Sequence, residues 1–112
     1  VADALAAAET LQAEGVSAEV IDLRSLLPLD GVTILESVAK TGRAVIAHRA
    51  TDFMGPAGEI SALISQELFG QLKAAPQRVA GAFTPVPKHT GLLPLHYTGA
   101  AGIAAAARET LK

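Results

Sequence analysis

The chain has 112 residues, of which 50% are hydrophobic and 18% charged, a composition that predicts one globular domain and excludes intrinsic disorder. Its formal net charge is −2 and its nine Lys and Arg residues are scattered, so it lacks the electrostatic footprint of a protein that binds nucleic acid or an anionic membrane. The absence of cysteine excludes disulfides and thiolate metal ligands, and no apolar run approaches the ~20 residues of a membrane span.

The first part of the chain predicts helix, strand and helix in that order. Apolar residues at helical spacing predict a helix over residues 3–14, which Gly15 ends. The consecutive Val and Ile within residues 16–23 predict a strand buried on both faces, as in a parallel sheet covered by helices. Asp30 is placed to cap a second helix over residues 32–40. These segments are typical of an α/β protein.

The middle of the chain repeats this alternation. A continuous apolar run predicts an interior strand over residues 44–48, and the spacing of apolar residues 60–68 predicts a third helix. Residues 77–81 predict a weaker third strand. The proline-rich and glycine-rich residues 82–98 predict a long irregular connection, and loops of this length usually have a role.

A final helix completes the predicted fold. Thr98 is expected to cap a helix that reaches Leu111 and buries a stripe of Ile103, Ala107 and Leu111. Short strands between helices predict a three-layer α/β/α sandwich with a mainly parallel sheet, formed as a single domain over residues 1–112. Because three strands make a thin sheet, we expect at least one strand upstream of Val1, in a longer protein.

The carboxyl end of the second strand is the candidate ligand or interface edge. His48 ends that strand beside Arg49, where open α/β sheets usually bind ligands, so the pair could transfer a proton or hold an anion. Glu59 follows a glycine-rich turn at a helix N-terminus. We prefer a hydrogen-bonded structural role for His48, because no nucleophile or partner carboxylate is fixed by spacing.

The remaining polar candidates also favour structural roles. Asp22 and Arg24 are two residues apart on extended chain at the end of the predicted strand, and they are interpreted as a structural ion pair rather than a catalytic dyad. A metal site joining His48 to His89 and His96 is not expected, since no closely spaced ligand pair marks it. The residues therefore predict no catalytic, cofactor-binding or metal site.

Four segments carry a family resemblance: VIDLRSLLPLD at residues 20–30, ILESVAKTGRAVIAH at 34–48, GPAGEISALISQELF at 55–69 and TPVP at 84–87. Together they resemble the C-terminal domain of the transketolase superfamily. The resemblance is greatest to the beta subunit of thiamine-diphosphate-dependent 2-oxo acid dehydrogenases, which act on pyruvate, branched-chain 2-oxo acids or acetoin. It is clear to about Pro87. Arg49 departs from the acidic residue that is common in the family, and GPAGEI departs from the usual GFGAEI-like loop.

This resemblance implies an accessory and assembly domain that is not catalytic by itself. The full enzyme would oxidatively decarboxylate a 2-oxo acid on thiamine diphosphate and Mg, held by other domains, and acylate a lipoyl group. The implied partners are the rest of the beta subunit, an alpha subunit, the lipoyl acyltransferase core and further copies of the chain. The implied location is the bacterial cytoplasm or the mitochondrial matrix. The alternatives are the C-terminal domain of a transketolase-type enzyme and a stand-alone module that binds a small anion.

The resemblance also implies a missing strand. The family places a central strand, upstream of Val1 here, between the strands that contain Val20 and Val45. Without it, two interior edges would carry unpaired backbone groups. We therefore expect the chain to recruit a strand from another chain or to close its sheet differently. A single chain whose two strands lie apart with nothing between them would contradict this hypothesis.

Overall fold

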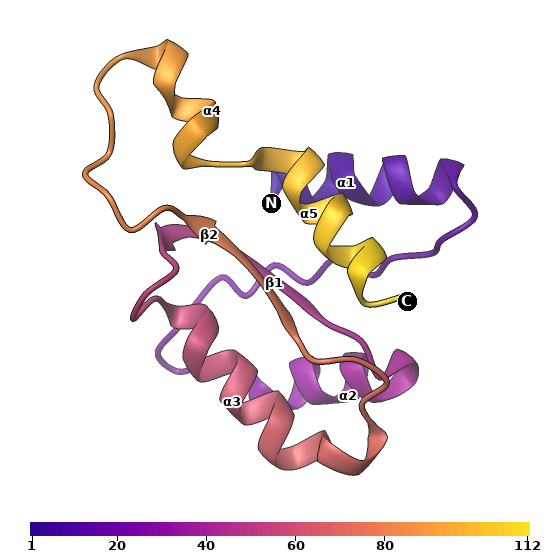
Figure 1. Ribbon diagram of the computed structural model, residues 1–112. Coiled ribbons are helices and arrows are strands. Elements are labelled where there is room, and N and C mark those ends of the chain that lie inside the picture. Colours follow the sequence, from indigo (N-terminus) through magenta and orange to yellow (C-terminus); the bar gives the residue numbers. More distant parts are fainter.

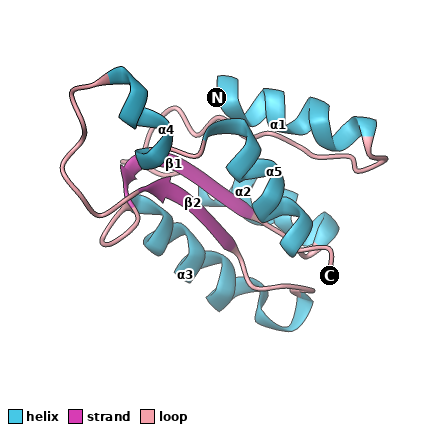
Figure 2. Cartoon of the chain, turned by 45° about the horizontal axis from the view of Figure 1, so that its top comes forward, coloured by secondary structure: helices cyan, strands magenta, loops and turns pink.

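Two parallel strands with helices on both sides form the centre of the computed structural model, which describes all residues Val1–Lys112 (Figures 1 and 2). The α/β class and the parallel sheet are as predicted. In chain order the elements are α1 (Ala2–Ala13), α2 (Gly31–Thr41), β1 (Val45–Thr51), α3 (Pro56–Leu68), the 3₁₀ turn η1 (Phe69–Gln71), β2 (Gln77–Gly81), the 3₁₀ turn η2 (Thr90–Leu92), α4 (Leu93–His96) and α5 (Gly99–Glu109).

The helices cover the two faces of the sheet as separate layers. Helices α2 and α3 pack on one face, and α1 and α5 pack together on the other (Figure 2). Each layer has its own buried cluster. The larger cluster contains Ile34, Val38, Ile46, Ala57, Ile60, Ile64 and Leu68. The smaller cluster contains Ala7, Leu11 and Ala104. The predicted sandwich is therefore present, but its hydrophobic core is divided in two.

The predicted ends of the first two helices are confirmed. Helix α1 gives way to Gly15, which has a φ of +82°. The Asp30 carboxylate caps α2 by accepting a hydrogen bond of 3.0 Å from the Thr33 amide, and Gly42 ends the helix at a φ of +71°. These signals are local: each depends on residues within one turn, so the sequence predicts them well.

The predicted strand over residues 16–23 is not present. Residues 17–22 run alongside the core without any backbone–backbone hydrogen bond. Val20 and Ile21 are half-buried rather than buried on both faces. The cause is the lack of a neighbouring strand, since β1 pairs only with β2. Of the two expected outcomes, a sheet closed differently within the chain is wrong, because this segment and β1 lie apart with a groove between them. Recruitment of a strand from another chain stays a prediction.

Smaller corrections concern the second half of the chain. Strand β1 continues beyond His48, because Thr51 pairs with Gly81 after an irregularity in register. The connection over residues 82–98 contains η2 and α4. Thr98 makes no side-chain capping hydrogen bond to α5, and Leu111 is 45% exposed. Ala104 is the buried residue of this helix, because α5 packs mainly on the alanine-rich face of α1. None of the helices is both long and apolar enough to cross a membrane.

The substitution Asp30→Asn should distinguish the effect of the helix cap on stability from the effect of the Asp30 charge. A hydrogen bond from the Thr33 hydroxyl, and then one from its amide, hold the pKa of Asp30 below its ordinary value of 3.8. A carboxyl whose pKa is lower in the folded state stabilises the fold above its unfolded pKa, and this contribution is lost as the pH falls through the folded pKa. We therefore expect Asp30→Asn to keep a capped α2 but to lose less stability between about pH 5 and pH 2.5.

Urea unfolding at several pH values, followed by circular dichroism, measures this slope. Glu36→Gln is the matched control, because Glu36 is exposed on the same helix and lies away from the cap. It removes one exposed carboxylate from α2 without changing the cap at Asp30. An unchanged slope in Asp30→Asn would contradict the prediction.

Candidate functional site

His48 packs against the turn that starts α3. A Cβ atom on Gly55 would lie 2.6 Å from His48 Cε1, so only glycine allows this close approach. Both ring nitrogens are buried and have no hydrogen-bond partner in the chain. The structure does not provide the hydrogen bonds that we expected for His48. A buried imidazole without partners is a costly arrangement that other residues or a partner could satisfy.

Arg49 is directed to the opposite face of β1. Its Nη2 lies 2.9 Å from an Asp3 carboxylate oxygen, and its guanidinium carbon lies 4.9 Å from the centre of the Tyr97 ring. Arg49 thus joins the strand to α1 and to the segment before α5. Glu59 lies exposed in the first turn of α3. The structure therefore does not bring His48, Arg49 and Glu59 together into one anion-binding site.

Asp22 and Arg24 form an exposed local ion pair. Arg24 Nε lies 2.9 Å from Asp22 Oδ2, and the Arg24 side chain is 86% exposed. Arg24 has a φ of +59°, so the chain is not extended at this residue, as the predicted pairing had assumed. Exposed pairs of this kind contribute little stability.

The other two histidines serve the connection between β2 and α5. His96 is buried, and its Nδ1 lies 3.2 Å from the Thr84 hydroxyl. His89 Nδ1 accepts a hydrogen bond from the Gly91 amide. No three His, Asp or Glu side chains converge anywhere in the chain to hold a metal ion. These residues therefore do not fit the Mg–diphosphate group that the resemblance implies for the full enzyme.

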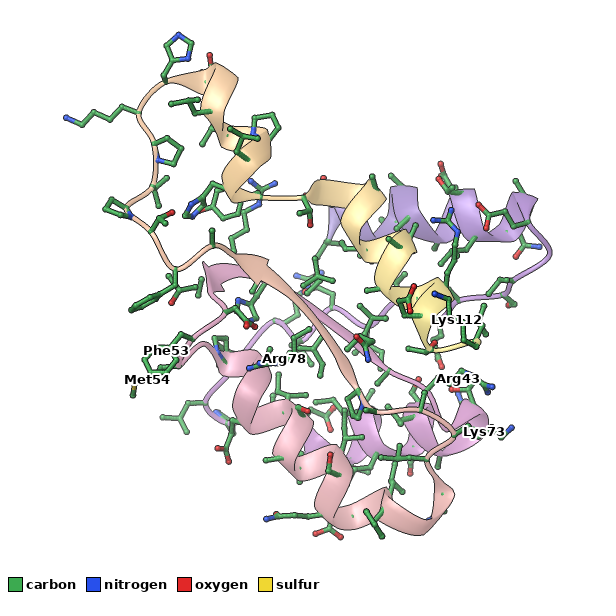
Figure 3. The ribbon with its side chains drawn as sticks, in the orientation of Figure 1. Arg43, Phe53, Met54, Lys73, Arg78 and Lys112 are labelled. Atoms are coloured by element: carbon green, nitrogen blue, oxygen red, sulfur yellow. The ribbon has the colours of Figure 1, made fainter.

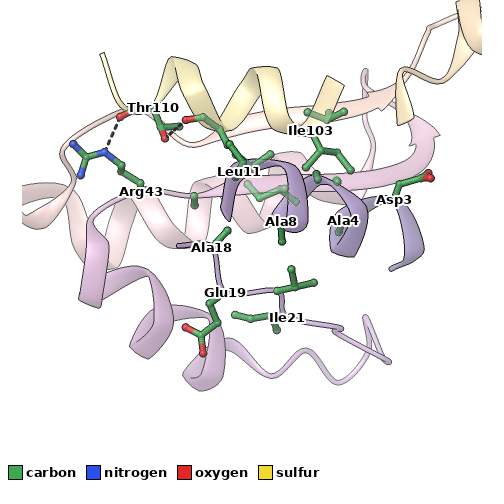
Figure 4. Close-up of a pocket in the computed structure, with 18 of the residues that line it drawn as sticks. Asp3, Ala4, Ala8, Leu11, Ala18, Glu19, Ile21, Arg43, Ile103 and Thr110 are labelled. Carbon is green, nitrogen blue, oxygen red and sulfur yellow. Dashed lines mark hydrogen bonds between the residues drawn. The ribbon is translucent and has the colours of Figure 1, made fainter. Parts of the chain in front are cut away.

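A groove of about 600 Å³ lies between α1, residues 16–23 and β1 (Figure 4). Its lining is mostly hydrophobic and includes Ala4, Ala8, Leu11, Val20, Ile21 and Ile103. The sequence analysis did not predict it, because the groove depends on the distance between elements that are not adjacent in the chain. The thin sheet and the missing central strand that the resemblance implies were the signals for it.

Several polar side chains at this groove have partners within the chain. The Glu19 carboxylate accepts a hydrogen bond of 2.6 Å from the Ser37 hydroxyl and lies 3.3 Å from Lys40 Nζ. The Ser37 hydrogen bond and then the Lys40 ammonium lower the pKa of Glu19. Arg43 Nε donates a hydrogen bond of 2.7 Å to the Thr110 carbonyl. The groove therefore has an apolar interior with these paired polar groups around it, whereas His48, which also lines it, has no hydrogen-bond partner.

A second surface feature lies beyond the carboxyl end of β1. Phe53 and Phe83 meet edge to face with ring centres 5.1 Å apart, yet they are 60% and 71% exposed. Met54, also labelled in Figure 3, is 90% exposed. We call Phe53, Met54 and Phe83 the edge patch. Large apolar side chains gathered on a surface are typical of a protein–protein contact site.

Comparison with known proteins identifies related sequences. Residues 1–103 match the family described as "Transketolase, C-terminal domain". The chain is 50% identical over 109 residues to the acetoin:2,6-dichlorophenolindophenol oxidoreductase subunit beta of Cupriavidus necator, covering 97% of this chain and 32% of that protein. It is 46% identical over 84 residues to the pyruvate dehydrogenase E1 component subunit beta of Leifsonia xyli subsp. xyli, covering 75% and 25%.

A third relative is the 2-oxoisovalerate dehydrogenase subunit beta of Pseudomonas aeruginosa, which is 52% identical over 73 residues, covering 65% of this chain and 21% of that protein. The chain thus spans less than a third of the length of these relatives. The family match extends beyond Pro87, to which the resemblance was expected to be clear. The chain belongs to the transketolase C-terminal domain family.

Proposed function

We propose that this chain is the accessory and assembly domain of a 2-oxo acid dehydrogenase beta subunit. The observation that carries this proposal is the 50% identity to the acetoin oxidoreductase beta subunit over 97% of the chain. Similarity to pyruvate and 2-oxoisovalerate dehydrogenase beta subunits supports the same subunit class. A transketolase-type enzyme is the less favoured assignment, because these relatives are all dehydrogenase or oxidoreductase beta subunits.

In this role, Val1–Lys112 forms one domain of a longer subunit and provides contact surfaces for assembly rather than catalytic residues. Thiamine diphosphate, bound by the remainder of the enzyme, would supply the carbanion stabilisation that decarboxylation requires. The edge patch is the candidate contact with the rest of the beta subunit or with an alpha subunit, because it exposes aromatic and Met side chains. A lipoyl acyltransferase core and further copies of the chain complete the proposed assembly.

The proposed location is the cytoplasm for a bacterial source and the mitochondrial matrix for a eukaryotic one. Relatives of both kinds support this pair: one is bacterial, and the 2-oxoisovalerate dehydrogenase subunit beta of Dictyostelium discoideum is named as mitochondrial.

A domain exchange tests the proposed function. Residues Val1–Lys112 would replace the matching segment of the Cupriavidus necator beta subunit, and the chimera would be produced with that organism's alpha subunit. We expect co-elution in size-exclusion chromatography and acetoin-dependent reduction of dichlorophenolindophenol within about tenfold of the parent enzyme, or about 1.4 kcal/mol in transition-state stabilisation.

The edge patch supplies the control for this exchange. In the chimera, Phe53→Ser with Phe83→Ser should reduce co-elution with the alpha subunit, because both side chains are exposed and apolar. Phe69→Ser should leave co-elution unchanged, since Phe69 is 83% exposed but lies outside the patch. A folded chimera that elutes alone and lacks activity would contradict the proposed function.

A further inference from the structure

One threonine hydroxyl in the chain lies against an imidazole. Thr84 Oγ1 is 3.2 Å from His96 Nδ1, and the two residues lie near the two ends of the connection that extends away from the sheet after β2 (Figure 1). The other hydroxyls that donate hydrogen bonds donate them to carbonyl or carboxylate oxygens. Because a carboxylate is a weaker base than an imidazole, Thr84 has the neighbour best suited to accept its proton.

The imidazole of this pair is held in place by its surroundings. His96 is 5% exposed. A Cβ atom on Gly81 would lie 3.1 Å from His96 Nε2, so this edge of the ring lies against the end of β2. The Tyr97 ring meets the imidazole edge to face, with ring centres 4.4 Å apart, and the Ala82 amide donates a hydrogen bond of 3.1 Å to the His96 carbonyl. The base is therefore oriented before any ligand binds.

A small cavity adjoins the pair. It measures about 190 Å³ and is lined by Thr84, Pro85, Pro87, Leu92, Leu95 and His96. Sites for drug-sized molecules usually measure about 300–1,000 Å³, so this cavity accepts only a small group. Its proline rings and leucine side chains are apolar, and its polar side chains are those of Thr84 and His96. Thr84 is exposed, so a molecule from the solvent can reach its hydroxyl.

We propose that Thr84 is an acyl-acceptor site, at which its hydroxyl attacks an activated short-chain acyl ester with His96 as general base. The bond from Thr84 Oγ1 to the acyl carbon forms, and the bond from that carbon to the leaving oxygen of the donor breaks. The hydroxyl proton passes to His96 Nδ1 and then to the leaving oxygen. This role requires the tautomer with the proton on Nε2, in which Nδ1 accepts the hydrogen bond from Thr84.

The product is a Thr84 ester that forms once per chain. The Thr84 amide already donates a hydrogen bond of 2.8 Å to the Ala82 carbonyl, so it is not free to stabilise the oxyanion that hydrolysis of the ester requires. The site is thus one of covalent modification rather than of turnover. The proposal does not depend on the proposed function, because it uses only the contact between Thr84 and His96 and the cavity beside them.

Acylation of the full chain by p-nitrophenyl butyrate tests the site, with peptide mass spectrometry to locate the ester. Thr90 is the internal control, because it is exposed in the same connection beside His89, whose Nδ1 is occupied by the Gly91 amide. We expect Thr84 to be acylated at least about tenfold faster than Thr90. Equal labelling of the two threonines, or no labelling of Thr84, would overturn the proposal.

Paired histidine variants test the general base. His96→Asn should slow the acylation of Thr84 by about a hundredfold, whereas His89→Asn should leave it unchanged. Circular dichroism checks that both variants fold. A folded His96→Asn chain that labels Thr84 at the native rate would show that His96 is not the base.

The pH dependence in the native chain decides the same question without a variant. The ratio of Thr84 to Thr90 labelling should rise between about pH 5 and pH 8, because only a neutral imidazole accepts a proton. A constant ratio would overturn the role of His96.

The length of the acyl chain tests the cavity. The ratio of Thr84 to Thr90 labelling should be lower with p-nitrophenyl decanoate than with the butyrate, because the cavity is too small for the longer chain. A ratio that does not change with chain length would contradict the assignment of the cavity as the acyl site.

Discussion

Ile64→Ala should lower the free energy of unfolding by roughly 2–5 kcal/mol, because it removes three buried carbon atoms and leaves a cavity. Ile64 is 1% exposed, in the middle of α3 and within the larger buried cluster. Only 14 of the 112 residues are buried, so few other contacts can compensate for the loss. Urea unfolding followed by circular dichroism measures the effect, and we expect the variant to be largely unfolded at temperatures that the native chain tolerates.

Two further variants control this result. Val32→Ala removes apolar carbon atoms from a side chain that is 67% exposed on α2, and it should change the free energy of unfolding by less than about 0.5 kcal/mol. Ile64→Val should cost about 0.5–1.5 kcal/mol. Equal urea midpoints for Ile64→Ala and Val32→Ala would mean that the larger cluster is not the stabilising core.

Several elements were predicted correctly from short stretches of sequence. The cap at Asp30, the stop at Gly42 and the third strand at residues 77–81 all appear in the structure as expected. The cap and the stop depend on interactions within a few residues. The third strand also needed a partner from a distant part of the chain, and it forms because β1 provides one. The alternation of helices and strands therefore also predicted the layer arrangement.

The strand over residues 16–23 was predicted from the same kind of pattern and is absent for a non-local reason. Val20 and Ile21 have high strand propensity, but a strand forms only when a neighbouring strand accepts its hydrogen bonds. The neighbour is not supplied by this chain, whose sheet contains only β1 and β2. The local sequence pattern indicates that a segment could form a strand, whereas hydrogen bonding to a neighbouring strand determines whether the strand forms.

The sequence contained a sign that His48 and Arg49 would not form one site. His48 and Arg49 are adjacent residues of a predicted strand, and adjacent strand residues point to opposite faces. That rule alone argues against a joint anion site, and the structure directs His48 toward α3 and Arg49 toward α1. The edge patch, in contrast, could not be predicted, because it joins Phe53 and Phe83 from two separate loops.

Gly55→Ala should destabilise the chain by about 1–3 kcal/mol and displace the His48 ring. A Cβ atom at this position would lie 2.2 Å from the Thr51 carbonyl oxygen and 2.6 Å from His48 Cε1. The carbonyl is part of the backbone of β1, so the side chain cannot avoid it by rotating. The φ of Gly55 is −80°, which alanine adopts freely, so the cost comes from the clash and not from backbone strain.

Gly70→Ala is the matched control for this effect. A Cβ atom on Gly70 would meet nothing within 4 Å, so the same substitution should be neutral or stabilise the chain by up to about 1 kcal/mol through the unfolded state. The free energy of unfolding measures stability, and the NMR signals of the His48 ring report its position. Because both variants change glycine to alanine, a loss of stability confined to Gly55→Ala, with shifted His48 signals, would establish the contact between this turn and β1. Equal stabilities and unchanged ring signals would show that His48 does not pack against Gly55, and the carboxyl end of β1 would then have a different arrangement.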